Sequence, residues 1–220
     1  MGGLTGDPLF RETCFVVIDF EATTPAGHPA QPIEVAALAL RYGEQGWTES
    51  GRSTSLIRPP AFAPVTFANT AQNGLTPQHF TAAPTPAEAL GALDRRFTAH
   101  ARYLLVAQHA ATEANIIHHQ REHCPRMARL DFLDTIPLAK HMLPGLANYK
   151  LDTLLAHCAI PLPADRHRAY ADVDVTAQVF TTLIDTADRT GQLHDLAALV
   201  KVAGRTAKAN RPTQAHLFDL

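Results

Sequence analysis

The sequence predicts a mixed α/β domain in which one β-sheet is flanked by helices. Three apolar, β-compatible segments with short connections occupy residues 14–57, a pattern typical of an antiparallel meander. From residue 103 onward, short apolar segments alternate with helical stretches, as in units that add strands to a sheet through helices. The chain has 220 residues, of which 46% are hydrophobic, so it can bury a core without disulfides or a structural metal.

The first strands follow from short apolar runs separated by turn residues. Residues 14–20 (CFVVIDF) are apolar and rich in β-branched side chains, which predicts a buried first strand. Prolines and a glycine interrupt residues 23–32, which are therefore expected to form a loop. Residues 33–42 are apolar again, and a turn at residues 43–46 leads into a third strand at residues 47–57.

The later elements begin after a long connection. Residues 58–86 are rich in proline, alanine and threonine, and we expect them to pass over one face as a long excursion. A helix should follow at residues 86–99, because Leu90, Leu93 and Phe97 recur at three- and four-residue spacing. The remaining strands are predicted at residues 103–107 and 130–134, and the remaining helices at residues 109–123, 135–142, 150–158, 169–189 and 194–202.

Charge, apolar runs and cysteines limit the class of protein. The chain has 19 Lys and Arg against 21 Asp and Glu, a formal net charge of −2, so contact with a polyanion requires a local patch or bound metal. The apolar runs are too short to span a bilayer, and residues 1–10 lack a signal-peptide pattern. The 3 cysteines are widely spaced, which argues against a disulfide framework. We therefore expect a soluble, cytoplasmic protein.

The chain is expected to form one folded domain with two short ends. Residues 1–11 are polar and rich in glycine, and we expect an N-terminal extension there. Residues 12–203 would form the domain. From residue 204 the sequence becomes basic and contains proline, so residues 204–220 are expected to form a flexible tail.

Two acidic residues at the end of the first predicted strand give the first chemical signal. Side chains alternate along a strand, so Asp19 and Glu21 lie on the same face. Neighbouring carboxylates repel each other, so such a pair needs a cation, a shared proton or bulk water. A solvated strand end explains the pair equally well when it is considered alone.

Two further acids and a histidine lie near predicted strand and helix ends. His167 lies in a loop, and Asp172 lies in the first turn of the following helix, where the helix dipole favours negative charge. Glu113 lies in the first turns of the helix after the strand at residues 103–107. Acids at the mouth of one sheet, with a histidine shortly before the last of them, form a far more specific pattern than any single acid.

At these residues the chain resembles the DnaQ-like (DEDDh) 3′–5′ exonucleases. The resemblance covers residues 12–190 and includes the segments NGLT at residues 73–76 and LDTL at residues 151–154. Its most specific piece is HRAYAD at residues 167–172. It implies the DnaQ-like exonuclease fold, an RNase H-like mixed β-sheet flanked by α-helices.

The resemblance also implies hydrolysis of phosphodiester bonds with two divalent cations, Mg²⁺ or Mn²⁺. Asp19, Glu21 and Asp172 would hold the first cation, whereas Asp19 and Glu113 would position the second. His167 would act as the general base on the attacking water. Two such ions, roughly 3.5–4 Å apart, stabilise both the attacking and the leaving oxygen, and hard cations prefer carboxylate ligands.

Glu113 departs from the family pattern, in which this acid is usually aspartate. The extra methylene moves the carboxylate by about 1.5 Å, and a displacement of that size can reduce the rate strongly. An active enzyme and a catalytically weakened nucleic-acid-binding or clamp-tethered adaptor therefore both stay open. Asp174 is expected to point away from the site, since it follows Asp172 by only two residues on a helix.

The motifs leave the substrate open between DNA and RNA. The motif DFEAT at residues 19–23 also occurs in RNA-trimming relatives, whereas the motif HRAYAD is more similar to that of the bacterial proofreading enzymes. We expect cleavage at the 3′ ends of single-stranded or frayed DNA, in proofreading or repair. RNA trimming is the alternative.

The last seven residues, QAHLFDL, resemble the peptide by which bacterial polymerases and repair proteins bind the sliding clamp. Leu217 and Phe218 would enter an apolar pocket of the clamp, and Gln214 would serve as a polar anchor. Residues 204–211 contain basic side chains and no acid, so they could also contact a nucleic-acid backbone. The alternative is that Leu217 and Phe218 dock on the domain itself.

Overall fold

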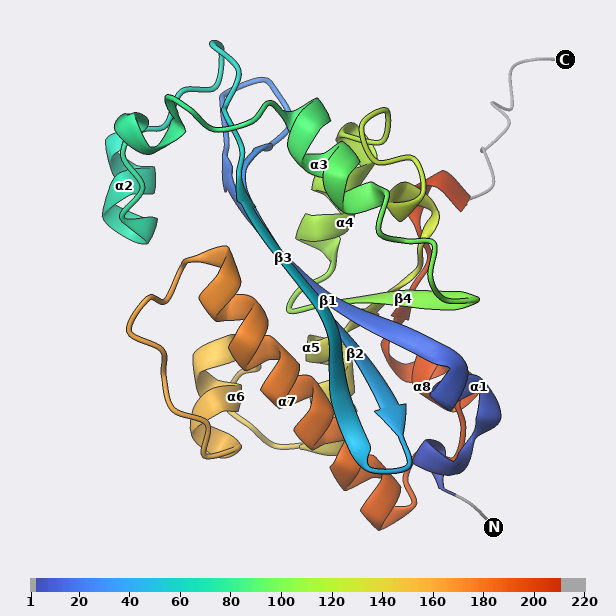
Figure 1. Ribbon diagram of the computed structural model, residues 1–220. Coiled ribbons are helices and arrows are strands. Elements are labelled where there is room, and N and C mark those ends of the chain that lie inside the picture. The colour runs from blue at the N-terminus through green and yellow to red at the C-terminus, as the bar shows by residue number, and fades with distance from the viewer. Residues whose placement is uncertain (1–2, 211–220) are drawn as a thin grey trace, which may run out of the picture.

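The computed structural model describes residues 3–210, which form one sheet of six strands in the order β3-β2-β1-β4-β5-β6 (Figure 1). The central strand β1 (Thr13–Thr23) pairs antiparallel with β2 (Gln31–Gly43) and parallel with β4 (Arg102–Ala107). The remaining strands are β3 (Gly46–Leu56), β5 (Phe132–Asp134) and β6 (Gly204–Arg205). The predicted mixed sheet, with its antiparallel meander first in sequence, is confirmed.

Helices cover both faces of the sheet because β1 is apolar on both faces. Phe15 and Val17 belong to one buried cluster, whereas Val16 and Ile18 belong to another. The first cluster is covered by α1, α5, α6, α7 and α8, and the second by α3 and α4 (Figure 1). The helices are α1 (Pro8–Glu12), α2 (Phe67–Asn73), α3 (Pro86–Asp94), α4 (Ala111–His119), α5 (Thr135–Met142), α6 (Leu151–His157), α7 (Ala169–Thr190) and α8 (Leu196–Ala203).

The excursion at residues 58–86 is more ordered than its proline content suggests. It contains α2 and a 3₁₀ turn at Pro77–Phe80, and the Phe80 side chain is buried. The hydroxyl of Thr23, at the end of β1, donates a hydrogen bond to the carbonyl of Ala63 at 3.2 Å. The excursion is therefore fixed to the strand that carries the predicted acidic pair.

Parts of the expected N-terminal extension and of the expected C-terminal tail pack against the rest of the structure. Leu4 and Phe10 are fully buried in the first cluster. At the other end, β6 pairs with β5, and the backbone N–H of Ala207 donates to Asp131 at 2.8 Å. Residues 4–10 and 204–207 therefore pack against the domain expected at residues 12–203. Gln214, Leu217 and Phe218 lie outside the described residues. Among residues 3–210, no helix has the length and apolar character needed to cross a membrane.

Candidate active site

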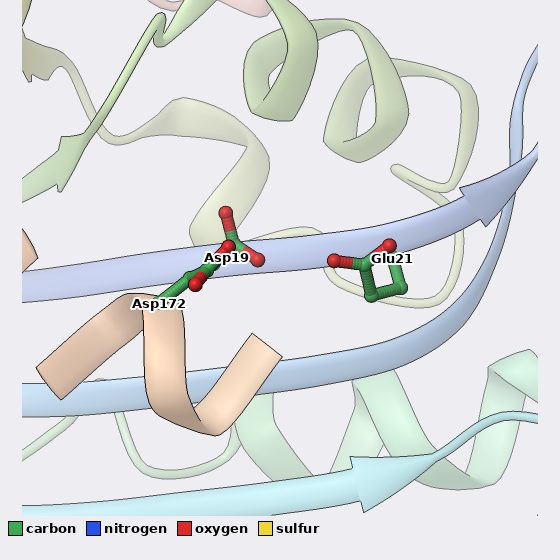
Figure 2. A group of neighbouring side chains, drawn as sticks. All are labelled: Asp19, Glu21 and Asp172. Carbon is green, nitrogen blue, oxygen red and sulfur yellow. The ribbon is translucent and has the colours of Figure 1, made fainter. Parts of the chain in front are cut away.

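Three carboxylates converge where β1 passes the start of α7. Asp19 and Glu21 project from β1, and Asp172 reaches them from the first turn of α7 (Figure 2). One carboxylate oxygen from each residue lies within 4.8 Å of the corresponding oxygens of the other two. Within residues 3–210, no other group of three or more histidine, cysteine, aspartate or glutamate side chains is arranged to hold a metal ion. We refer to Asp19, Glu21 and Asp172 as the acidic cluster.

An ion pair holds the start of α7 against the sheet. Glu34 is buried on β2, directly opposite Glu21 in the strand pairing. The Nη2 atom of Arg168 donates to Glu34 at 2.7 Å, and Nε donates at 3.0 Å. The backbone N–H of Ala169, one of the unsatisfied donors at the start of the helix, also donates to Glu34 at 3.1 Å. Glu34 therefore sets where α7 begins and thus where Asp172 lies.

Burial and mutual repulsion disfavour charge on the acidic cluster. Burial raises the pKa of Asp19 well above its usual value, and the charges of Glu21 and Asp172 raise it further. Burial also raises the pKa of Glu21 to about 7, although a hydrogen bond from Asn73 opposes this change. Positive charge placed among these carboxylates would favour their ionised forms.

Glu113 is electrostatically coupled to Asp19 but is not part of the acidic cluster. It lies in the first turn of α4, its residue is 3% exposed, and its Oε2 atom has no hydrogen-bond partner. Asp134 accepts hydrogen bonds from the backbone N–H groups of His109 at 3.2 Å and Ala110 at 3.0 Å, which fixes the start of this helix. Burial raises the pKa of Glu113 well above its usual value, and the charge of Asp19 adds to the increase.

The oxygens of these residues fit a divalent cation. The Oδ1 atom of Asp172 and the Oε2 atom of Glu113 are both buried without a hydrogen-bond partner. A buried carboxylate oxygen without a partner is costly, and hard divalent cations bind such oxygens. The donor set consists of carboxylates only, which is the ligand chemistry that Mg²⁺ and Mn²⁺ prefer.

The loop before α7 places an arginine, not the predicted histidine, on the acidic cluster. Arg166 forms an ion pair with Asp172, and its Nε atom donates to Asp152 on α6 at 2.9 Å. His167 is exposed, has a backbone φ of 66° and is not part of the cluster. The structure therefore brings Asp19, Glu21 and Asp172 together, and it leaves His167 at the surface of the loop.

Two arginines of the site were missed by sequence reasoning. Arg166 and Arg168 flank His167, but their acidic partners lie on α6, α7 and β2, which only the tertiary fold identifies. Their one signal in the sequence is the presence of two basic residues beside a candidate catalytic histidine. The expectation that Asp174 points elsewhere is confirmed, because it pairs with Arg52 on β3.

The family comparison agrees with this geometry. A family model described as exonuclease, RNase_T, matches residues 16–180. The chain belongs to the RNase_T exonuclease family. The match includes the acidic cluster, Glu113 and His167. This match confirms the prediction that the chain is a DnaQ-like exonuclease.

Curated relatives with similar sequences are much longer than this chain. The DNA polymerase III PolC-type of Clostridium perfringens (strain 13 / Type A) is 26% identical over 185 residues, which are 84% of this chain. The chain spans about 12% of the length of the curated relatives it matches. The similarity is thus to one segment of those proteins.

Solved structures share the fold at low sequence identity. The nuclease domain of 3′hExo, a DEDDh family member bound to rAMP, has a TM-score of 0.68 and 15% identity, and the match covers 83% of this chain and 96% of that one. Exonuclease X in complex with 5′ overhanging duplex DNA has a TM-score of 0.59 and 18% identity, with 84% and 99% covered. These likenesses confirm the predicted RNase H-like exonuclease fold.

Proposed function

We propose that the chain is a metal-dependent 3′–5′ exonuclease that hydrolyses phosphodiester bonds at the 3′ ends of single-stranded or frayed DNA. The observation that carries this proposal is the convergence of Asp19, Glu21 and Asp172 within 4.8 Å of one another. The buried Glu113 beside them, coupled to Asp19, supplies the fourth acid of the family pattern.

In this proposal each acid has a defined role. Asp19, Glu21 and Asp172 hold one divalent cation, and Asp19 and Glu113 hold a second. When bound, such cations lower the pKa of a water molecule and stabilise the charge that develops on the phosphate oxygens. Asp19 lies on the central strand and is the ligand common to both positions, so its loss should be the most damaging.

The protein's own contribution is to hold these carboxylates in place and to move one proton. The pairing of β1 and β2 fixes Asp19 and Glu21, and the bond between Glu34 and Ala169 fixes the start of α7. His167 would accept the proton of the attacking water at an imidazole nitrogen, whose usual pKa suits that task near neutral pH. Its exposed position requires the loop to bring the ring toward the cluster during turnover, as catalytic contacts often tighten only with substrate.

DNA is the proposed substrate because the sequence relatives are DNA polymerase III of the PolC type. The structurally similar Exonuclease X binds duplex DNA with a 5′ overhang, which supports the same choice. RNA trimming is the second candidate, since the 3′hExo nuclease domain was solved with rAMP. The same relatives support a proposed role beside a polymerase, and a role in repair is the alternative. Binding of the sliding clamp through Gln214, Leu217 and Phe218 would bring the enzyme to its substrate.

The test is a time course on 5′-labelled single-stranded DNA and RNA of the same sequence. Each is incubated with Mg²⁺, Mn²⁺ or EDTA, and Asp19→Ala serves as the control for contaminating nucleases. We expect a metal-dependent ladder of products shortened from the 3′ end, formed faster on DNA and absent with the variant. A faster ladder on RNA would favour trimming, and bound but uncut oligonucleotide would favour the weakened, binding form.

Two variants test the remaining parts of the proposal. Glu113→Ala should abolish cleavage and leave the fold intact, whereas survival of most activity would remove Glu113 from the site. For the tail, intact protein and a Gln214→Ala/Phe218→Ala variant are compared in a pull-down with the sliding clamp. Equal retention of both would exclude clamp binding through this segment.

A further inference from the structure

The guanidinium group of Arg166 contacts two carboxylates on different helices. It forms an ion pair with Asp172 on α7, and its Nε atom donates to Asp152 on α6 at 2.9 Å. The side chain of Arg166 is 17% exposed, that of Asp172 is 11% exposed and that of Asp152 is 64% exposed. Arg166 thus contacts the acidic cluster through Asp172 and the protein surface through Asp152.

The contact with Asp172 uses a ligand that the proposed metal also requires. Arg166 pairs with the Oδ2 atom of Asp172, while the Oδ1 atom is buried without a partner. One oxygen of Asp19 and one of Glu21 lie within 4.8 Å of an oxygen of Asp172. A guanidinium group and a divalent cation are both attracted to this concentration of negative charge, and two positive charges held on one carboxylate repel each other.

The same contact also restrains the loop that carries His167. Arg166 is tied to Asp172, and Arg168 is tied to Glu34, so the residues on both sides of His167 are held. His167 itself has φ of 66°, a left-handed conformation that is unfavourable for a residue with a side chain. Release of Arg166 from Asp172 would leave the Arg166 side of His167 held only by the ion pair with the exposed Asp152.

We propose that Arg166 is a positioning residue that competes with divalent cations for Asp172 and couples cation binding to the position of His167. This inference rests on the proposed function. Asp152 gives the displaced guanidinium group a second partner, so Arg166 can leave Asp172 without losing both of its ion pairs. A cation at the cluster thereby loosens one of the two restraints beside the proposed general base.

A purely structural role for Arg166 makes the opposite prediction. If Arg166 only holds Asp172 in its place, its removal should leave cation affinity unchanged or weaken it. If Arg166 competes with the cation, its removal should strengthen cation binding. The sign of the change in affinity therefore separates the two roles, and it does so without a measurement of cleavage.

The experiment is a titration of the full chain with Mn²⁺, in which unbound Mn²⁺ is followed by electron paramagnetic resonance and the heat of binding by calorimetry. The variants are Arg166→Gln, Arg166→Lys and Arg126→Gln. Arg126 is exposed and lies outside the acidic cluster, so its variant controls for the loss of one positive charge. Thermal unfolding in EDTA establishes that each variant is folded before it is titrated.

We expect Arg166→Gln to bind Mn²⁺ about fivefold to tenfold more tightly than the wild type, the scale of a partly exposed ion pair. Arg166→Lys keeps the charge but cannot donate to Asp152 and Asp172 in the forked geometry of arginine, so its affinity should rise about twofold to threefold. Arg126→Gln should match the wild type. If Arg166→Gln does not fold, Arg166→Lys decides.

Two failures are distinguishable. If the wild-type protein binds no Mn²⁺, both the proposed two-cation function and the proposed competition by Arg166 are contradicted. Wild-type protein that binds Mn²⁺, with unchanged or weaker binding by the Arg166 variants, would leave the function intact and overturn the role given to Arg166.

Discussion

Arg166 and Arg168 stand on either side of His167 and form ion pairs that differ in their surroundings. The Glu34 side chain is 2% exposed, and both of its oxygens accept hydrogen bonds, from Arg168 and from the backbone of Ala169. Asp172 is also buried, but Arg166 reaches only one of its oxygens and the other has no partner.

The difference between the two acids indicates different uses. A buried carboxylate whose oxygens are all hydrogen-bonded has no capacity left for a ligand, so Glu34 stabilises the fold. A buried carboxylate oxygen without a hydrogen-bond partner has lost its hydration without compensation, and a bound cation can offset this unfavourable free energy. A change at Asp172 should therefore reduce activity more than stability. A change at Glu34 should reduce stability.

The largest expected effect is on the activity of Asp172→Asn. This variant keeps the size of the side chain but removes a proposed metal ligand, so the cleavage rate with Mn²⁺ should fall by about 1000-fold or more, or about 4 kcal/mol of transition-state stabilisation. Its unfolding free energy in EDTA should change by less than about 1 kcal/mol, because the loss of one ion pair is offset by less repulsion within the cluster. The rate is measured on labelled single-stranded DNA and the stability by urea unfolding.

Asp174→Asn is the matched control for that experiment. It makes the same chemical change two residues further along α7, where the side chain pairs with Arg52 and lies outside the acidic cluster. Its cleavage rate should equal that of the wild type. A similar loss of activity in both variants would show that the effect comes from α7 in general and not from a ligand.

The second effect is on the stability of Glu34→Gln. Removal of one partner from a buried ion pair leaves Arg168 without its counter-charge, and the unfolding free energy should fall by about 3 kcal/mol. Urea unfolding in EDTA measures this change. Replacement of both Glu34 and Arg168 by Met should recover part of the loss, because no unpaired charge then stays buried. An unchanged stability of Glu34→Gln would end the distinction between the two acids.

The sheet and the long helix could be predicted because they depend on local patterns. The apolar run at residues 14–20 lies within β1 (Thr13–Thr23), and α7 (Ala169–Thr190) ends where Gly191 takes φ of 66°, a conformation that favours glycine. Alternation along β1 was also sufficient to place Asp19 and Glu21 on one face.

Features that depend on distant partners could not be predicted. β6 has only two residues, and its pairing with β5 joins segments about 70 residues apart in sequence. α2 is a seven-residue helix in a proline-rich segment, begun by a reciprocal cap between Thr66 and Asn69. Arg166 lies beside the recognised motif, but nothing local shows that α6 and α7 present acids to it.

The third effect is a dependence of stability on pH. Burial raises the pKa of Glu21 from 4.5 to about 7, so the folded protein retains a proton that the unfolded chain releases at lower pH. In EDTA, the unfolding free energy should therefore fall by about 3 kcal/mol as the pH rises from 4.5 through 7. Asp19 and Glu113 shift in the same direction and add to the decrease.

Saturating Mn²⁺ should remove this decrease, since the cation stabilises the ionised carboxylates. Urea unfolding at pH 5 and pH 8, with EDTA or Mn²⁺, measures both curves. Glu21→Gln provides the control, because in EDTA its stability should vary less with pH. A stability in EDTA that increases from pH 5 to pH 8 would contradict the buried, repulsive cluster.

The smallest effect is expected at the exposed ion pair between Arg52 and Asp174, whose side chains are 46% and 40% exposed. Water screens both charges, so Asp174→Asn should lower the unfolding free energy by less than about 1 kcal/mol, and high salt should reduce the difference further. Urea unfolding at low and high salt measures both values. This variant calibrates the comparison, because it shows what an ion pair contributes without burial. If its cost equalled that of Glu34→Gln, the burial of Glu34 would not be the reason that its pair stabilises the fold.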